Sequence, residues 1–411
     1  MNKLFNPGTI NLGSKLGAKG AFFIFSFYLI NVLSVEDLAR YALFYATLRI
    51  LTFFGVNSMN ITRFDELRAQ FTGEQTQTGL VGELLMSVVI NHVALYLITL
   101  PFFPDVTLIT LANIAALAFS VIRLLADFSR FDGKVSGSIW IEDVCFTLVF
   151  ILLSVFLLTQ MEALQAVTTA IVIAGFCGTL CGILVFRKKM RAYGVRLKRE
   201  KPRLNLRDFL LNTEFSILKG LTVFTMYAFR FFGMRFYGDQ MVAETHVLLQ
   251  QFNMFSLVSI SIISGFQSKI VRKAEEIIDW PWLKSTYKTV QFPTLYLSLA
   301  GLFLFFIFAE NVLILIAPEF AYLVPELRIT IGVIALFLIF NPLFYLFFMN
   351  KKVAYRRRVT VVLYAVLGLM ISLGNFIVNW RIWFFGLLGL LVLFPLVFSV
   401  ISLMNLRPRN E

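Results

Sequence analysis

Long, uninterrupted apolar runs limit what this chain can fold into more than any other feature. Each run has about twenty residues, which is the length that an α-helix needs to cross the hydrocarbon of a bilayer. Apolar residues make up 58% of the 411 residues and charged residues only 15%, whereas a soluble domain is about a quarter charged. Because backbone polar groups in lipid must be paired within the protein, the runs predict transmembrane helices.

Twelve such runs can be delimited, and together they predict an all-α polytopic membrane protein with about twelve transmembrane helices. The runs are residues 16–33, 40–61, 80–101, 106–126, 137–159, 163–186, 208–230, 242–266, 290–317, 328–350, 359–379 and 383–404. The ninth run is long enough to end in a bent or re-entrant piece. No loop between the runs is long enough to fold as a soluble domain, so we expect the helices themselves to carry the function.

The basic residues indicate how these helices are oriented. If the N-terminus is inside, 29 of the 37 Lys and Arg residues fall in inside segments or near the inside ends of runs, 5 fall in outside loops or at the outside ends of runs, and the other 3 are assigned to the interior of the runs. Cytoplasmic loops of membrane proteins carry such an excess of Lys and Arg. We therefore expect both termini in the cytoplasm. The same rule explains the net charge of +13, so we expect no nucleic-acid partner.

A faint internal repeat divides the chain into two halves. The segment LGAKGAFFIFSFYL in the first run resembles SILKGLTVFTMYAF in the seventh, and the two place Lys19 and Lys219 at matching depths. The most basic loop lies between the sixth and seventh runs. We predict an N-terminal six-helix lobe at 1–186, a basic cytoplasmic linker at 187–207, and a C-terminal six-helix lobe at 208–411. Two lobes of the same orientation are a known transporter plan.

Three basic residues lie within the runs, where orientation does not require them: Lys19, Arg49 and Lys219. An ionisable side chain inside a membrane helix costs a few kcal/mol and marks a functional site by default. We predict that these three cations line a substrate-binding cavity for an anionic group such as a phosphate. For Lys19 and Lys219, an ammonium that snorkels to the lipid headgroups is an equally good interpretation. Arg49 lies mid-run, where its planar five-donor fork suits phosphate or carboxylate.

Acidic residues in or beside the runs are candidates for ion coupling. They are Asp127, Glu142, Asp143 and Glu214. An acidic group in a cavity can carry a coupling proton, although a structural role is the stronger interpretation for any single one of them. For Asp127, which has Arg123 and Arg130 at helical spacing, that role is a salt-bridge stripe at the membrane surface. Glu142 and Asp143 are adjacent, so a helix would point them in different directions.

The sequence shows none of the common catalytic motifs that we looked for. It contains no Walker-type loop, no Cys/His metal cluster and no G-x-S-x-G motif. The cysteines Cys145, Cys177 and Cys181 lie inside apolar runs and are interpreted as small buried side chains. The histidines His92 and His246 are isolated and are interpreted as packing or hydrogen-bonding groups. We expect a transporter rather than an enzyme, with no metal site and no cofactor.

The first two runs also carry a resemblance to a known family. The residues that carry it are Leu33-Ser34-Val35-Glu36-Asp37, Tyr41, Phe54-Gly55 and Arg63-Phe64. They resemble the turn and second helix of the polysaccharide-transport (Wzx-type) flippases, in the multidrug/oligosaccharidyl-lipid/polysaccharide (MOP) exporter superfamily. Residues 231–255 resemble the matching start of the second lobe. One departure is Ala39-Arg40, where the family often has a glycine before the tyrosine.

The resemblance implies a V-shaped, MATE-like transporter of two lobes in the bacterial inner membrane. It would move an undecaprenyl-diphosphate-linked oligosaccharide, a repeat unit of O-antigen, capsule or exopolysaccharide, to the periplasmic leaflet by alternating access. A cation-lined cavity and coupling to H⁺ or Na⁺ would follow, with membrane lipid and polysaccharide polymerase or chain-length proteins as partners. Two alternatives stay open: a multidrug or cation antiporter of the same superfamily, which would favour an acidic cavity, and a non-transport component of a polysaccharide-synthesis complex.

Overall fold

The computed structural model describes a large part of the chain, and every element within that part is a helix. The described residues are 7–56, 79–100, 105–129, 136–192, 213, 216–217, 220–250, 281, 284–285, 292–349 and 356–406. The chain divides into two compact units, which are described separately. Unit 1 comprises Met1–Ser26 and Val32–Tyr227, and unit 2 comprises Phe27–Asn31 and Ala228–Glu411.

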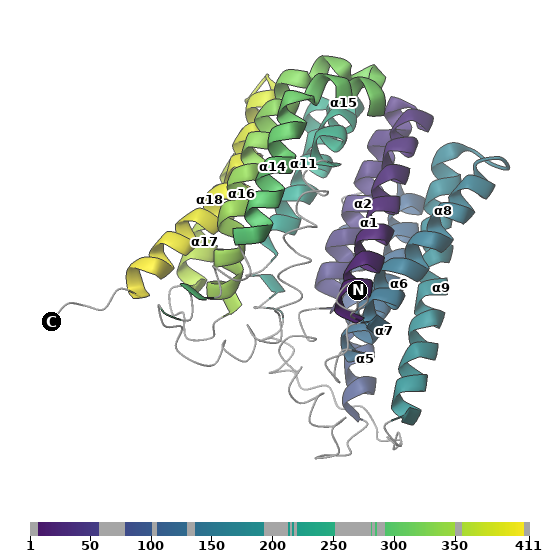
Figure 1. Ribbon diagram of the computed structural model, residues 1–411. Helices are drawn as coiled ribbons and strands as arrows, with labels where there is room; N and C mark the ends of the chain where they lie inside the picture. Colours follow the sequence, from purple (N-terminus) through teal and green to yellow (C-terminus); the bar gives the residue numbers. More distant parts are fainter. Residues whose placement is uncertain are drawn as a thin grey trace, which may run out of the picture. The chain divides into compact units, whose positions relative to one another are not determined.

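Unit 1 is a bundle of long helices (Figure 1). Its elements are α1 (Pro7–Val32, whose residues 27–31 are assigned to unit 2), α2 (Val35–Val56), α5 (Gly79–Thr99), α6 (Val106–Phe128), α7 (Ser136–Ile139), the π-helix η2 (Trp140–Cys145), α8 (Phe146–Leu157) and α9 (Ala163–Ala192). The centre of the bundle is α6, against which α2, α5 and α9 pack. Asp105 caps this helix by accepting a hydrogen bond from the Leu108 backbone N–H at 2.9 Å.

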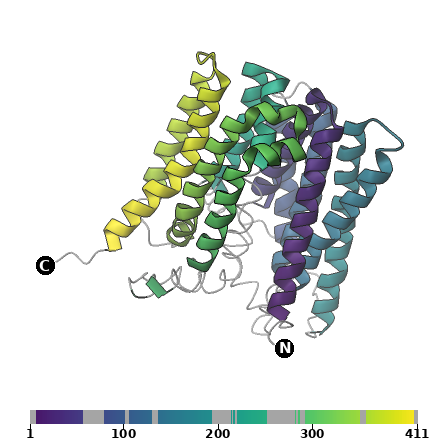
Figure 2. The same cartoon turned by 45° about the horizontal axis from the view of Figure 1, so that its top comes forward.

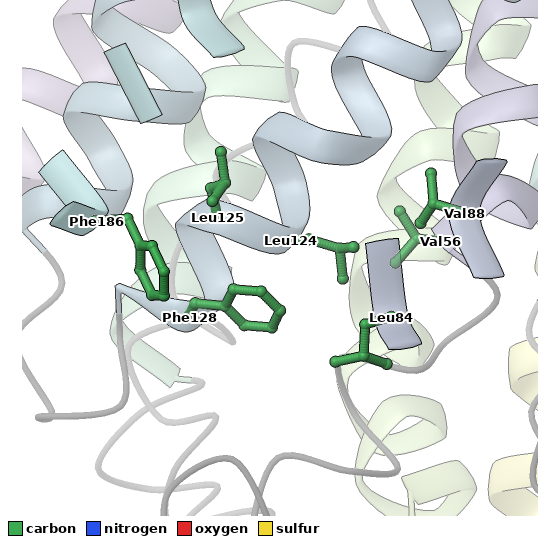
Figure 3. Close-up of a cluster of buried hydrophobic side chains, with 7 residues drawn as sticks. All are labelled: Val56, Leu84, Val88, Leu124, Leu125, Phe128 and Phe186. Atoms are coloured by element: carbon green, nitrogen blue, oxygen red, sulfur yellow. The ribbon is translucent and has the colours of Figure 1, made fainter. Parts of the chain in front are cut away.

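The core of unit 1 is apolar and closely packed near one end of α6. One cluster of buried side chains contains Val56, Leu84, Val88, Leu124, Leu125, Phe128 and Phe186 (Figure 3). Glycines on α9 let neighbouring helices approach. A Cβ built on Gly178 would lie 2.8 Å from Ile122 Cδ1, and one on Gly182 would lie 3.2 Å from Ile141 Cγ2. Small residues at such crossings are typical of helix packing in membranes.

A buried hydrogen-bond network joins α2, α5 and α6. The two ring nitrogens of His92 contact Asn113 Oδ1 at 3.1 Å and Ser120 Oγ at 2.8 Å. Asn91 donates to the Gly55 carbonyl at 3.1 Å. His92 is therefore a hydrogen-bonding group between helices, as its isolation in the sequence indicated. Within the described ranges, no group of three or more His, Cys, Asp or Glu residues could hold a metal ion.

Unit 2 is a second group of helices with one sharp break (Figure 2). It contains most of α11 (Leu221–Tyr237), helical residues 239–250, α14 (Phe292–Ile307), α15 (Ala309–Ile316), the 3-10 helix η4 (Pro318–Leu323), α16 (Val324–Met349), α17 (Arg356–Leu373) and α18 (Trp380–Leu406). The chain bends by 79° between α14 and α15. The bent piece predicted at the end of the ninth run is confirmed.

Aromatic side chains hold part of unit 2 together. Trp383 is fully buried and donates its indole N–H to the Met370 carbonyl at 2.9 Å. Its ring lies 6.4 Å from that of Phe229 and 5.5 Å from that of Tyr237. The hydroxyl of Tyr237 donates to the Ile377 carbonyl at 2.7 Å. Buried Trp and Tyr side chains usually find such partners for their polar atoms, and here these bonds join α11 to the α17–α18 pair.

The chain is a multi-pass membrane protein. Among the described residues, six helices are long and apolar enough to cross a membrane, or seven if the bent pair α14–α15 forms one span. Shorter apolar stretches, Gly17–Val32 and Arg358–Leu373, lie in α1 and α17. The twelve-helix count and the cytoplasmic termini stay predictions. The predicted lobe boundary at 187–207 falls largely on residues outside the described ranges and also stays a prediction.

Candidate functional site

Two of the residues singled out in the sequence meet in unit 1. The Lys19 ammonium on α1 lies 2.8 Å from Asp143 Oδ1 on η2. The Lys19 side chain is 32% exposed, whereas that of Asp143 is only 5% exposed. Of the two alternatives for Lys19, snorkelling to the headgroups is therefore disfavoured, because its ammonium is held by a carboxylate from another helix.

This ion pair lies well inside both of its helices. Lys19 precedes the turn between α1 and α2 by about 14 residues, and Asp143 precedes the end of α8 by about 14 residues. At 1.5 Å per residue, each lies roughly 21 Å from that end of its helix. Both residues fall within about the first turn of the apolar stretches of their helices, Gly17–Val32 and Trp140–Leu157. Neither residue serves as a helix cap there.

Asp143 lies in a π-helical segment between two α-helical ones. The run α7–η2–α8 is helical from Ser136 to Leu157, and η2 supplies Trp140–Cys145. π-Helical turns are rare and occur frequently at functional sites. Asp143 is buried and Glu142 is half-buried. The expectation that these neighbours point differently is met, since Asp143 faces α1.

An aromatic layer lies one helical turn beyond the ion pair. Phe22 follows Lys19 by three residues on α1, and Phe146 follows Asp143 by three on α8. Their ring centroids are 6.3 Å apart, and Phe22 also lies 6.2 Å from Tyr45 and 5.7 Å from Phe150. This side of the pair is therefore apolar. Electrostatic attraction is stronger beside such low-dielectric surroundings than in water.

Arg49 lies on the exposed face of α2, although its neighbours Leu48 and Ile50 are buried. Its guanidinium carbon is 5.9 Å from the centroid of the Tyr45 ring, a distance typical of a cation–π contact. Arg49 follows the α1–α2 turn by about 15 residues, so it lies at nearly the same depth as Lys19. Phe22 and Tyr45 connect the two cations along α1 and α2.

For Asp127, Lys219 and Glu214, the structure gives no position beside the Lys19–Asp143 pair. Asp127 is half-buried in the last turn of α6. Lys219 and Glu214 lie outside the described residues. Their proposed roles stay predictions.

Unit 2 contains a polar cluster that the sequence analysis missed. Glu244 is buried and accepts hydrogen bonds from Gln240 at 2.9 Å and from the Tyr322 hydroxyl at 2.6 Å. Glu326, which follows Tyr322 by four residues, forms an ion pair with Arg381. The sequence did not mark these residues as candidates, because they fall at or beyond the ends of apolar runs, where polar side chains are common.

Comparison with known proteins identifies the fold. No family model and no curated protein matches the chain. Among solved structures, a mutant of the Vibrio cholerae MATE transporter VcmN aligns with a TM-score of 0.61 at 14% identity, over 100% of this chain and 97% of that one. An inward-facing multidrug resistance MATE transporter of the MOP superfamily aligns with a TM-score of 0.55 at 15% identity, over 96% and 94%. An outward-facing one gives 0.59 at 14% identity, over 97% and 93%.

The protein has a MATE-like fold over its full length. This fold is that of transporters of the MOP superfamily. The result agrees with the all-α, MATE-like fold that the sequence predicted. At this level of identity the likeness concerns the fold, so the substrate has to be argued from the residues of the site.

Proposed function

We propose that this protein is a flippase for an undecaprenyl-diphosphate-linked oligosaccharide in the bacterial inner membrane. It would carry the repeat unit of O-antigen, capsule or exopolysaccharide from the cytoplasmic to the periplasmic leaflet by alternating access. The MATE-like fold supports transport. The positive sign of the accessible charge in the Lys19–Asp143 pair supports an anionic substrate.

The observation that carries the proposal is the unequal exposure of the ion pair. The accessible member is the cation Lys19, at 32%, and the buried member is Asp143, at 5%. A site for cationic drugs would need the reverse, with the carboxylate accessible. The arrangement therefore favours an anionic headgroup over the multidrug alternative.

Arg49 fits the same substrate. Its guanidinium can form two parallel hydrogen bonds with one phosphate, while the Lys19 ammonium acts as a point charge on another. A diphosphate offers two such groups. Lys219 is the third cation of the proposal. Membrane lipid, together with polysaccharide polymerase or chain-length proteins, completes the set of proposed partners, and H⁺ or Na⁺ coupling would use Asp127, Glu142, Asp143 or Glu214.

The test is a transport assay with purified protein in vesicles that contain an undecaprenyl-diphosphate-linked oligosaccharide. A lectin or glycosidase added outside reports the oligosaccharide that has crossed. We expect wild type to accelerate crossing and Lys19→Gln and Arg49→Gln to slow it. Glu36→Gln is the matched control, since it breaks the exposed Glu36–Arg40 pair on α2. If wild type leaves the oligosaccharide in place but moves a cationic dye, the multidrug alternative replaces this proposal.

A further inference from the structure

The Lys19 ammonium already has an anion beside it. Asp143 Oδ1 lies 2.8 Å away, at the distance of a charge-assisted hydrogen bond. That position is where an oxygen of an anionic substrate would have to lie. The positive charge of Lys19 is therefore neutralised by a carboxylate of the protein itself.

We propose that Asp143 is a specificity-determining residue that occupies Lys19 in the empty transporter and is displaced by the substrate. The inference rests on the proposed function. Any lipid that binds Lys19 must outcompete a carboxylate of one negative charge that is held in place by its own helix. A diphosphate, with more than one negative charge, can do so. A bilayer phospholipid with a single phosphodiester charge gains no advantage over Asp143.

The need for such a device follows from the depth and exposure of Lys19. A cation that is one-third exposed near the start of an apolar stretch can be reached by lipid headgroups, and phospholipids vastly outnumber a biosynthetic intermediate in any membrane. An uncovered Lys19 would attract anionic phospholipid by charge alone. The buried carboxylate removes that attraction and also avoids the cost of an unpaired ammonium beside the aromatic layer.

The geometry also gives Asp143 a way to leave. Lys19 has three donors on its ammonium, and the exposed part of the side chain offers a second anion an approach while Asp143 is still bound. The carboxylate is carried by the π-helical segment η2. A π-turn has a wider hydrogen-bonded ring than the α-turns on either side and occurs mostly as a short, single-turn bulge within an α-helix. A shift from π to α pairing would turn Asp143 relative to α8 and move α7 by about the rise of one residue, ~1.5 Å, along the helix axis.

The experiment measures binding of undecaprenyl diphosphate to the full-length protein in nanodiscs. One set of nanodiscs contains only phosphatidylcholine, and the other contains phosphatidylglycerol as an added single-charge competitor. In the neutral set we expect Asp143→Asn to bind about tenfold more tightly than wild type, a change equivalent to ~1.4 kcal/mol. Phosphatidylglycerol should then weaken binding to Asp143→Asn by about tenfold and binding to wild type by less than twofold.

Three further variants separate this idea from a merely structural ion pair. Lys19→Gln should lose affinity, and Lys19→Gln with Asp143→Asn should match Lys19→Gln, because Asp143 acts only through Lys19. Asp143→Glu should bind undecaprenyl diphosphate with the same low sensitivity to phosphatidylglycerol as wild type, since it keeps the negative charge. The exposed-pair control Glu36→Gln should behave as wild type. Should Asp143→Asn not fold, Asp143→Ser carries the same two expectations.

The outcomes distinguish this inference from the proposed function. If wild type binds undecaprenyl diphosphate and Lys19→Gln loses it, but Asp143→Asn has wild-type affinity or wild-type sensitivity to phosphatidylglycerol, the specificity role is wrong and the flippase proposal stands. If wild type does not bind undecaprenyl diphosphate in either set, the flippase proposal fails and the specificity role fails with it.

Discussion

Two ion pairs, one in each unit, look alike in exposure but differ in their place along the helices. In unit 1 Lys19 and Asp143 are 32% and 5% exposed, and in unit 2 Arg381 and Glu326 are 43% and 10% exposed. The first pair lies mid-helix. The second joins the first turn of α16 to the second residue of α18. At the start of a helix, a pair of an accessible cation and a buried carboxylate can simply join two helices. We therefore take such a pair as a candidate for ligand binding only where it lies away from the helix ends.

The surroundings of the two pairs strengthen the contrast. Beside Lys19 and Asp143 lies the aromatic layer of Phe22, Tyr45 and Phe146. The pair in unit 2 lies in the same region as Glu244, Tyr322 and Gln240, which hydrogen-bond to one another. Such a network ties helical residues 239–250 to η4. We therefore expect changes at the first pair to affect transport and changes at the second to affect stability.

The largest expected effect is at Lys19. Lys19→Gln should slow oligosaccharide crossing by about 30-fold or more, because a charged hydrogen bond to the substrate is worth ~2 kcal/mol or more. Lys19→Arg should retain most of the rate. The measurement is the vesicle assay at matched protein incorporation. If the Lys19→Gln rate lies within twofold of wild type, the Lys19–Asp143 pair has a structural role like that of the Glu326–Arg381 pair.

The next effect is on stability in unit 2. Glu326→Gln should lower the free energy of unfolding by ~1–2 kcal/mol, since it removes the charge that pairs with Arg381 in a largely buried place. Thermal unfolding in detergent would show a lower midpoint. The transport rate of the protein that remains folded should match wild type. A rate loss without a shift in the midpoint would contradict the contrast between the pairs.

A smaller effect is expected at Arg49. Arg49→Lys keeps the positive charge but loses the bidentate fork and the flat contact with Tyr45. Crossing should slow by about three- to tenfold, with no change in thermal midpoint. Arg40→Lys serves as the control, because Arg40 is exposed on the same helix and pairs with Glu36. Equal crossing rates for Arg49→Lys and wild type would show that Arg49 does not bind the substrate through its guanidinium group.

The smallest effect is expected beside Lys19 itself. A Cβ on Gly20 would meet no atom within 4 Å, so Gly20→Ala should change stability by less than ~0.5 kcal/mol. By contrast, a Cβ on Gly55 would lie 2.1 Å from His92 Nε2, and Gly55→Ala should lower the thermal midpoint clearly. An unchanged thermal midpoint for Gly20→Ala, beside a lowered one for Gly55→Ala, would support the free space next to Gly20 on α1.

The helices were largely predictable because hydropathy alone defines them. The run predicted at 106–126 is α6 at Val106–Phe128, and the run at 163–186 begins α9 at Ala163. The ends differ because helices continue into polar residues such as Lys189 and Arg191, which hydropathy cannot assign. The π-helical interruption in the fifth run left no mark in the apolar pattern.

The site was predictable in its members but not in its contacts. Lys19 and Asp143 each stood out as a charge within an apolar run. Nothing in a single sequence relates two residues more than 120 positions apart, and the direction of Asp143 depends on the π-turn. Glu244 was overlooked because it lies near the end of its run, where a carboxylate has an ordinary place at the membrane surface.

The π-helical segment has a consequence for the length of its span. The segment from Trp140 to Cys145 accommodates one residue more than α-helical pairing would hold over the same rise. Deleting Val144 would thus leave both ends of the span in place and make the segment continuously α-helical, with Asp143 next to Cys145 and its side chain turned by up to about 100° relative to α8, away from Lys19. The ion pair would be lost with every charged residue of the protein still present, so its position is specified by residue number as much as by residue type.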